Sequence, residues 1–418
     1  MADLGSREFA VDDKLSKLET GKEVATLQSK ALQDPAKLVS EAHERLRELY
    51  APNIGRALEE LTTPTLLLDL DMLKQNLGFM AEHMRDVPTT LRAHVKVHKS
   101  PDIARLQVEY GAIGVGCATV WEAIVMARAG IRDVFVINEL VGPEKTRALA
   151  LLAREADAKV AVDDVVQIDE LSLAAAAAGS TIGVLIDVDE GMHRCGVASA
   201  DEALILARRI EASNGLVFRG LTGYEGHCSL EFDETKRHAM CREAMAYLTG
   251  IADFLARNGF PSEIVTAAGT GTWEITSRYP GVTEIQPGSY ATMDGHHRGL
   301  EPRFGWAVTV LASVISRRSD RFVLDAGGKT VGASQGVLAP DGQKPFRFDE
   351  EHSIWAADAT SPVKVGDKRE IRCNYTPNAI GYFDAYHVIE KGRVVDVWPV
   401  MPRGPESRWL LDLLERGE

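Results

Sequence analysis

Residues 91–100 read Leu91-Arg92-Ala93-His94-Val95-Lys96-Val97-His98-Lys99-Ser100. They follow a β-like run, Thr65–Leu70, and an amphipathic segment typical of a helix, so we expect Lys96 near the end of the second of a series of strands. A strand lysine between two valines is half-buried, and burial disfavours the ammonium form. Such a lysine can form a Schiff base with an aldehyde, and in a strand His98 shares its face. Taken alone, the stretch favours a basic surface strand with two incidental histidines; the rest of the chain changes that balance.

From residue 65 onward, short apolar runs rich in β-branched residues alternate with helix-prone segments rich in Ala, Leu, Glu and Arg. Their spacing of about 20 to 30 residues is the period of a βα unit. Continuous apolar strands indicate a parallel sheet covered on both faces, and about eight units are the size of a (β/α)8 barrel. We therefore predict a barrel over residues 61–300. A doubly wound sheet is the alternative, but no G-x-G-x-x-G follows the first strand. The expected strands are Thr65–Leu70, Arg92–Val97, Ile113–Cys117, Asp133–Ile137, Lys159–Val162, Ile182–Val188, Phe218–Tyr224, Ile264–Ala267 and Glu284–Gln286.

After about residue 300 the pattern changes to strands separated by glycine turns such as Gly327-Gly328 and Lys391-Gly392. This pattern is typical of a mainly antiparallel β domain, which we place at residues 301–418 with a short helical tail over Glu406–Arg416. Residues 1–60 are polar and helix-prone and are expected to form a peripheral helical extension. The expected strands of the β domain are Val308–Ser316, Arg321–Asp325, Glu370–Cys373, Ala385–Ile389 and Val394–Trp398.

Composition narrows the class of protein. The chain has 418 residues and a net charge of −14 without an extended basic block, which argues against nucleic acid or an anionic membrane as the main partner. Its five cysteines are scattered and form no C-x-x-C pair, so neither a disulfide framework nor a thiolate zinc site is expected. The first residues are charged and no run approaches the length of a membrane span, so we expect no signal peptide and a cytoplasmic protein.

Several candidate site residues fall where barrel strands end, and the βα loops of a barrel converge there to form the active site. Two loops that contain glycine and hydroxyl-bearing residues, Ala268–Thr272 and Gln286–Tyr290, follow successive late strands. They are either ordinary turns or a phosphate cradle of backbone N–H groups, and their position favours the cradle. Arg194 is able to bind a phenolate or a carboxylate, and Tyr224 is able to contact a ring. A lysine for an imine, a phosphate cradle and an arginine together indicate pyridoxal 5′-phosphate (PLP).

With these residues in place, the chain resembles the D-threonine aldolase/D-serine dehydratase family, whose fold is the alanine racemase-type barrel (fold type III) followed by a mainly antiparallel β domain. The resemblance covers roughly residues 36 to 405. Its motifs are His94–Lys99, Gly116–Ala123, Asp189–Val197, Gly269–Thr272, Glu284–Tyr290 with Met293-Asp294, Asp325–Gly327, Trp398–Val400 and Arg403-Gly404.

The resemblance also implies roles for individual residues. Lys96 would hold PLP as a Schiff base and act as the base at Cα, with His98 beside it. Arg194 would lie near the phenolic oxygen of the cofactor and Tyr224 near its ring. A homodimer is implied as well. The residues that would hold the phosphate are Gly269, Thr270, Gly271, Gly288, Ser289 and Tyr290.

The chain departs from the family in one motif. Family members bind a divalent metal through a Pro-Asn-His-x-Cys or Pro-Asn-His-x-Asp motif, whereas this chain has Ala379 and Gly381 at the two ligand positions of Pro377–Gly381. The metal is therefore either absent or relocated, and we predict no metal ligand. His296 and His297 are the better candidates for a replacement base or ligand. Asp384 and His387 also lie downstream of the motif, although His387 is more simply explained as a strand residue.

Three functions compete. A PLP-dependent lyase would cleave a D-β-hydroxy-α-amino acid by retro-aldol chemistry or eliminate its hydroxyl group, and we favour this function even without a metal ion. An amino-acid racemase or epimerase needs only chemistry at the Cα–H bond and two bases. A PLP carrier would need the cofactor loops but little substrate machinery. In the first two cases the partner is a small amino-acid substrate.

Overall fold

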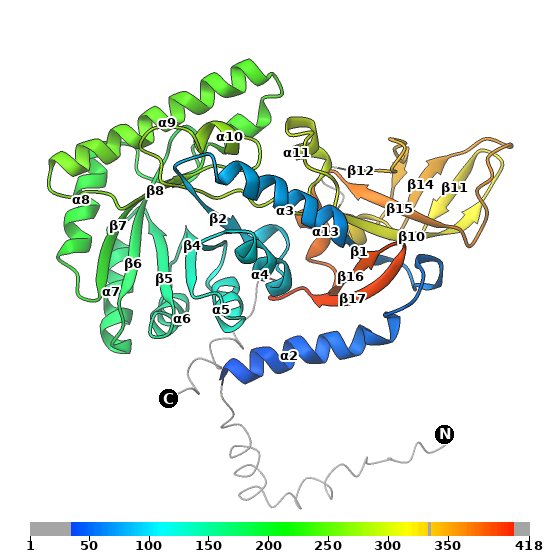
Figure 1. The fold of residues 1–418 in the computed structure, drawn as a ribbon, viewed down its shortest axis with the longest axis horizontal. Coiled ribbons are helices and arrows are strands. Elements are labelled where there is room, and N and C mark those ends of the chain that lie inside the picture. Colours follow the sequence, from blue (N-terminus) through cyan, green and yellow to red (C-terminus); the bar gives the residue numbers. More distant parts are fainter. Residues whose placement is uncertain (1–34, 333–335, 405–418) are drawn as a thin grey trace, which may run out of the picture.

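The computed structural model describes residues 35–332 and 336–404 and contains two packed units (Figure 1). The first is a closed barrel of eight parallel strands, β2 to β9 in chain order, and the second is a nine-stranded, largely antiparallel sheet. This arrangement confirms the predicted fold class. The barrel strands are β2 (Thr90–His94), β3 (Gly114–Cys117), β4 (Asp133–Glu139), β5 (Asp157–Val162), β6 (Ile182–Val188), β7 (Leu216–Gly223), β8 (Ile264–Ala267) and β9 (Glu284–Ile285).

Helices cover the outer face of the barrel, so its strands are buried on both sides. All seven residues of β6 are buried, for example, which explains the continuous apolar runs in the sequence. Five of these helices begin at a polar side chain that accepts a backbone N–H bond, at Ser100, Thr119, Asp164, Ser199 and Asp233. The helices are α4 (Pro101–Glu109), α5 (Val120–Arg128), α6 (Pro143–Leu152), α7 (Val165–Ala178), α8 (Ala200–Glu211), α9 (Glu234–Arg257) and α10 (Trp273–Thr276).

Charged side chains link the strands near their amino-terminal ends. The guanidinium of Arg92 on β2 is 1% exposed and donates to Glu284 on β9 at 2.8 Å, across the seam that closes the barrel. Arg92 also donates to Asp133 on β4, and Lys159 on β5 donates to the same carboxylate. Each buried charge therefore has an opposite partner, as burial requires.

The first apolar run of the alternating strand and helix pattern, Thr65–Leu70, does not belong to the barrel. It forms β1 (Thr65–Asp69), which pairs antiparallel with β10 (Val308–Arg317) and parallel with β16 (Ala385–Glu390) in the other sheet. The expectation that this run is the first barrel strand is therefore wrong. Its first four residues are buried, and a fully buried strand in the middle of either sheet gives the same apolar pattern. After β1, α3 (Leu70–Met84) leads the chain into the barrel.

The five strands predicted for the second unit are present with small changes of boundary, as β10, β11, β15, β16 and β17. The whole sheet, which also contains strands that were not predicted, has the order β13-β14-β11-β10-β1-β16-β17, and β15 pairs with β10 and β12. At the amino-terminal side, α2 (Pro35–Tyr50) lies along this unit, and Arg47 pairs with Asp396 of β17 at 2.8 Å. The helical tail expected at Glu406–Arg416 lies outside the described residues. The remaining elements are β11 (Arg321–Leu324), α12 (Gly328–Val331), β12 (Val337–Leu338), β13 (Arg347–Phe348), β14 (Ser353–Ala356), β15 (Lys368–Cys373), α13 (Thr376–Ile380) and β17 (Arg393–Pro399).

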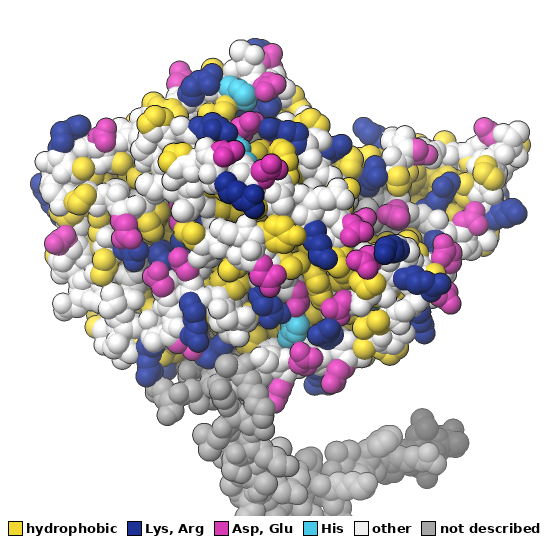
Figure 2. All heavy atoms as spheres, viewed as in Figure 1, with side chains coloured by type: hydrophobic (Ala, Val, Ile, Leu, Met, Phe, Trp, Pro, Cys, Tyr) yellow, Lys and Arg dark blue, Asp and Glu magenta, His cyan; other side chains and the backbone are white. Residues whose placement is uncertain are grey.

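The surface carries both signs of charge. Figure 2 shows Lys and Arg side chains interspersed with Asp and Glu over the face in view. Within the part of the chain that the structure describes, no helix is long and apolar enough to cross a bilayer.

Candidate active site

A pocket lies where the carboxyl ends of the barrel strands meet the second unit, the expected position of a barrel active site. It brings together most of the residues predicted from the sequence, although they come from six separate segments of the chain. The predicted residues that line it are Lys96, Arg194, Tyr224, Gly269, Thr270, Gly288, Ser289 and His297, whereas Gly271, next to Thr270, is not among them.

Lys96 lies in a short 3-10 turn, η3 (Val95–Val97), directly after β2. The expectation that it continues the strand is wrong in detail, because β2 ends at His94. The turn directs Val95 and Val97 into the protein, where both are buried, and Lys96 lines the pocket. Burial, together with the nearby Arg194 charge, lowers the pKa of the Lys96 ammonium below 10.5. The amine is therefore easier to deprotonate than an ordinary lysine.

The ring of Tyr224 lies between two cationic side chains. The Lys96 Nζ atom is 5.7 Å from the ring centroid, and the Arg194 guanidinium carbon is 5.6 Å from it. Burial raises the pKa of the Tyr224 hydroxyl to about 12, so it stays protonated at neutral pH. These three side chains together form an aromatic and cationic wall that suits a flat, anionic ligand.

Two loops present unused backbone donors to the same pocket. Among the described residues, the N–H groups of Thr270, Gly271, Gly288 and Ser289 donate no hydrogen bond to protein. Gly288 packs so closely that a Cβ atom there would lie 2.6 Å from the carbonyl oxygen of His94. The loops thus form a concave set of donors of the kind that binds phosphate, and they fit the cofactor expected from the sequence.

Two predicted site residues lie behind the pocket instead of in it. His98 is fully buried, and its ring accepts the Ser100 N–H and bonds to Gln107 at 3.1 Å. Burial lowers the pKa of His98 to about 4, and the prediction that it shares the face of Lys96 is wrong because the strand ends before it. Tyr290 receives a hydrogen bond from Gln107 through its hydroxyl group and donates its backbone N–H to Thr270. Both side chains therefore support the loops that line the pocket.

Four polar side chains that line the pocket were not predicted as site residues: His94, Asn138, Gln286 and Tyr375. The Nδ1–H of His94 donates to the carbonyl oxygen of Gly116, which leaves Nε2 as an acceptor. Burial and the Lys96 charge hold the pKa of His94 well below 6.5. Gln286 donates its amide to Thr266 at 2.7 Å, so its carbonyl oxygen remains available. His94 and Gln286 each lie two residues before a predicted site residue, and this short spacing in the sequence could have indicated that they line the same pocket.

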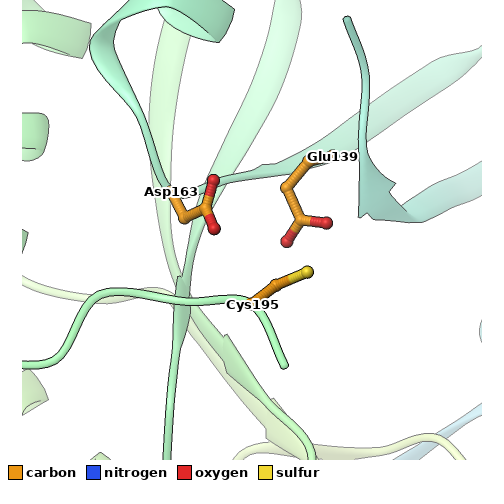
Figure 3. A group of neighbouring side chains, drawn as sticks. All are labelled: Glu139, Asp163 and Cys195. Atoms are coloured by element: carbon orange, nitrogen blue, oxygen red, sulfur yellow. The ribbon is translucent and has the colours of Figure 1, made fainter. Parts of the chain in front are cut away.

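A group of possible metal ligands lies on the rim of the barrel next to Arg194 (Figure 3). The ligand atoms of Glu139, Asp163 and Cys195 lie within 4.8 Å of one another. Both carboxylate oxygens of Asp163, however, accept hydrogen bonds, from Gln167 and from the N–H of Gly196. Burial and the Glu139 carboxylate raise the pKa of the Cys195 thiol, which disfavours the thiolate that a metal needs. This group serves to fasten the loop that carries Arg194.

The segment that binds a metal in the resembled family offers no ligand here. Ala379 is fully buried in the core, and the position of a Cβ on Gly381 has no atom within 4 Å. The two alternative candidates nearby are occupied: His387 lies in β16 and bonds to Asn53 at 2.8 Å, and Asp384 accepts from the hydroxyl of Tyr50.

The two adjacent histidines of α11 (Gly295–Leu300) have different surroundings. His296 bonds through Nε2 to the carbonyl oxygen of Ser229 and packs against Phe232, and it is not among the residues that line the pocket. His297 does line the pocket and bonds through Nδ1 to Asp294 at 2.9 Å. The structure therefore separates two residues that the sequence could not distinguish.

Comparison with known proteins agrees with this geometry. Residues 68–295 match the family model of the alanine racemase N-terminal domain, and residues 307–389 match a serine dehydratase domain. The chain is 35% identical to a D-threonine aldolase of Arthrobacter sp over 84% of this chain and 95% of that protein. It is 28% identical to a D-threo-3-hydroxyaspartate dehydratase of Delftia sp. (strain HT23) over 81% and 97% of the two chains. The crystal structure of a D-threonine aldolase from Filomicrobium marinum superposes with a TM-score of 0.81 at 36% identity, covering 84% of this chain and 98% of that one.

Proposed function

The chain belongs to the D-threonine aldolase/D-serine dehydratase family with the alanine racemase-type barrel, and on this premise we propose that it is a PLP-dependent lyase of D-β-hydroxy-α-amino acids. The observation that carries the proposal is the placement of Lys96. Its buried amine, with a lowered pKa, lies in one pocket with a phosphate cradle and an aromatic wall.

The residues of the pocket fit the cofactor. The free N–H groups of Thr270, Gly271, Gly288 and Ser289 would hold the phosphate, and Lys96 would bond to the aldehyde carbon. Bound there, PLP supplies an electron sink that stabilises negative charge at the Cα atom of an amino acid.

The protein residues then control where protons go. With PLP and substrate bound, the Lys96 amine would be able to take or return a proton at Cα, because burial and the Arg194 charge lower the pKa of its ammonium and so ease its deprotonation. Arg194, which lies over the Tyr224 ring, would supply a positive charge near the phenolic oxygen of PLP, and Tyr224 would contact the cofactor ring. The carbonyl oxygen of Gln286 would be available to accept a hydrogen bond in the pocket, since the amide nitrogen already donates to Thr266.

Between the two lyase reactions, we favour cleavage of the Cα–Cβ bond to an aldehyde and a smaller amino acid. This reaction needs a base at the β-hydroxyl group, and His297 presents an unoccupied ring nitrogen to the pocket. Elimination of the hydroxyl group is the second candidate, supported by the 28% identity to a dehydratase. A racemase is disfavoured because the second unit matches a serine dehydratase domain.

The experiment that tests the proposal uses the PLP-loaded protein and both enantiomers of threonine, 3-phenylserine, 3-hydroxyaspartate and serine. Aldehyde is measured by coupled reduction with NADH, and keto acid and ammonia are measured in parallel. We expect aldehyde from D-configured substrates only. Absence of all three products from every D-configured substrate would refute a lyase.

The homodimer and the cytoplasmic location remain proposals that rest on the family and the composition. Sedimentation velocity of the PLP-loaded protein tests the first, with a dimer of the 45.6 kDa chain as the expected species.

A further inference from the structure

His297 and Asp294 form a pair that fixes which nitrogen of the imidazole faces the pocket. Asp294 is fully buried, and both of its carboxylate oxygens lie 2.9 Å from His297 Nδ1. An ionised carboxylate only accepts hydrogen bonds, so Nδ1 must carry the proton. The neutral ring therefore has a lone pair on Nε2, which has no protein partner among the described residues.

The pair is held in one orientation by its surroundings. The Asp294 carboxylate also accepts the backbone N–H of His297 at 2.8 Å, which begins helix α11. The ring of Tyr375 lies nearly parallel to the imidazole, with centroids 6.5 Å apart and 26° between the planes. The hydroxyl of Thr376, the first residue of α13, donates to the carbonyl oxygen of Met293, which ties the start of α13 to the segment just before α11. A base that is held in this way needs little reorganisation before it accepts a proton.

The pair lies next to the segment that has lost its metal ligands. The N–H of His296 donates to the carbonyl oxygen of Asn374 at 3.0 Å, so α11 begins against the chain that leads into Ala379 and Gly381. Within the described residues, the one group of three potential metal ligands is Glu139, Asp163 and Cys195, and His297 is not part of it. A divalent ion beside His297 would therefore not meet a set of three His, Cys, Asp or Glu ligands in this arrangement.

We propose that the His297–Asp294 pair replaces the metal ion as the group that activates the β-hydroxyl of the substrate, an inference that rests on the proposed lyase function. In the step, the β-hydroxyl O–H bond breaks and its proton moves to His297 Nε2. The Cβ–O bond becomes the carbonyl of the aldehyde, and the electron pair of the Cα–Cβ bond stays on Cα. Cα then takes up one proton, so no water, oxidant or reductant is consumed. Asp294 stabilises the imidazolium that forms.

The test compares His297→Gln with His296→Gln, the adjacent histidine outside the pocket, and with wild type, all loaded with PLP in heavy water with and without EDTA. Two signals are followed by proton NMR: aldehyde formation from a D-β-hydroxy-α-amino acid, and exchange of the Cα proton of D-alanine, which has no hydroxyl group. We expect wild type and His296→Gln to cleave equally well in EDTA. His297→Gln should lose cleavage by about 100-fold or more while it keeps Cα exchange and the absorbance of bound PLP, which show that the variant is folded and loaded.

The separate kinetic constants distinguish a proton acceptor from a structural residue. His297→Gln should lower kcat and kcat/KM for cleavage by the same factor and leave KM largely unchanged, because the lost interaction forms only as the O–H bond breaks. Loss of wild-type cleavage in EDTA with recovery on adding Mn²⁺ would overturn the proposal, as would undiminished cleavage by His297→Gln. A wild type that exchanges Cα protons and forms neither aldehyde nor keto acid would instead refute the lyase function itself.

Discussion

Gly288 offers a sharp test of the phosphate cradle. An alanine Cβ at this position would lie 2.6 Å from the carbonyl oxygen of His94 and 3.0 Å from Cγ2 of Val97. The first contact is with backbone, so rotation of a side chain cannot relieve it, and the two residues flank Lys96. In the protein without PLP the loop can move away, but cofactor binding must restore its position. The strain of such overpacking is about 1–3 kcal/mol, which corresponds to a PLP dissociation constant about 5- to 150-fold higher.

The measurement is a titration of the PLP-free protein, followed by absorbance of the bound cofactor, for wild type, Gly288→Ala and Gly381→Ala. The last variant is the matched control, because its Cβ meets no atom within 4 Å and its φ of −61° suits alanine. We expect Gly381→Ala to bind PLP as wild type does. An unchanged dissociation constant for Gly288→Ala would refute the assignment of the phosphate to this loop.

Two further predictions concern the surroundings of Lys96. Because burial and Arg194 lower its pKa below 10.5, its reaction with PLP should accelerate with rising pH and level off below pH 10.5. In Arg194→Met, stopped-flow absorbance should show this plateau at higher pH, and an unmoved plateau would contradict the role of the arginine. Lys99→Met removes the partner of Glu122, whose side chain is 1% exposed. We expect the free energy of unfolding, measured with urea, to fall by about 3 kcal/mol, which is the low end for a broken buried pair because Lys99 is partly exposed. Lys329→Met, at an exposed lysine, is the control. Equal losses in the two variants would contradict a stabilising role of the buried pair.

Much of the fold follows from the sequence because one local rule repeats. Most barrel strands are short, mainly apolar runs followed by a helix, and this period identifies the barrel without any long-range information. The same rule misplaced Thr65–Leu70, since a strand buried in the centre of the second sheet has the same apolar pattern. Which sheet receives a buried strand depends on partners far away in the chain, and periodicity does not encode them.

The residues of the candidate site also differ in whether the sequence could predict them. Lys96 and the loops of Gly269 and Gly288 have local signatures, so they could be predicted. The sequence could not show that His297 lines the pocket and His296 does not. This difference depends on Asp294 and Ser229, which contact the two rings from different segments. The assignment of His98 to the active face failed because the strand ends at His94, a local change of backbone that alternating valines do not reveal.

The central claim is that this protein breaks the Cα–Cβ bond of D-β-hydroxy-α-amino acids. Proton NMR of the PLP-loaded enzyme with D-threonine in heavy water tests it most directly, because one spectrum distinguishes every outcome. The account predicts the aldehyde signal of acetaldehyde together with glycine deuterated at Cα, and none of either from L-threonine. Loss of the Cα proton signal with the carbon skeleton intact would contradict the account and identify a racemase.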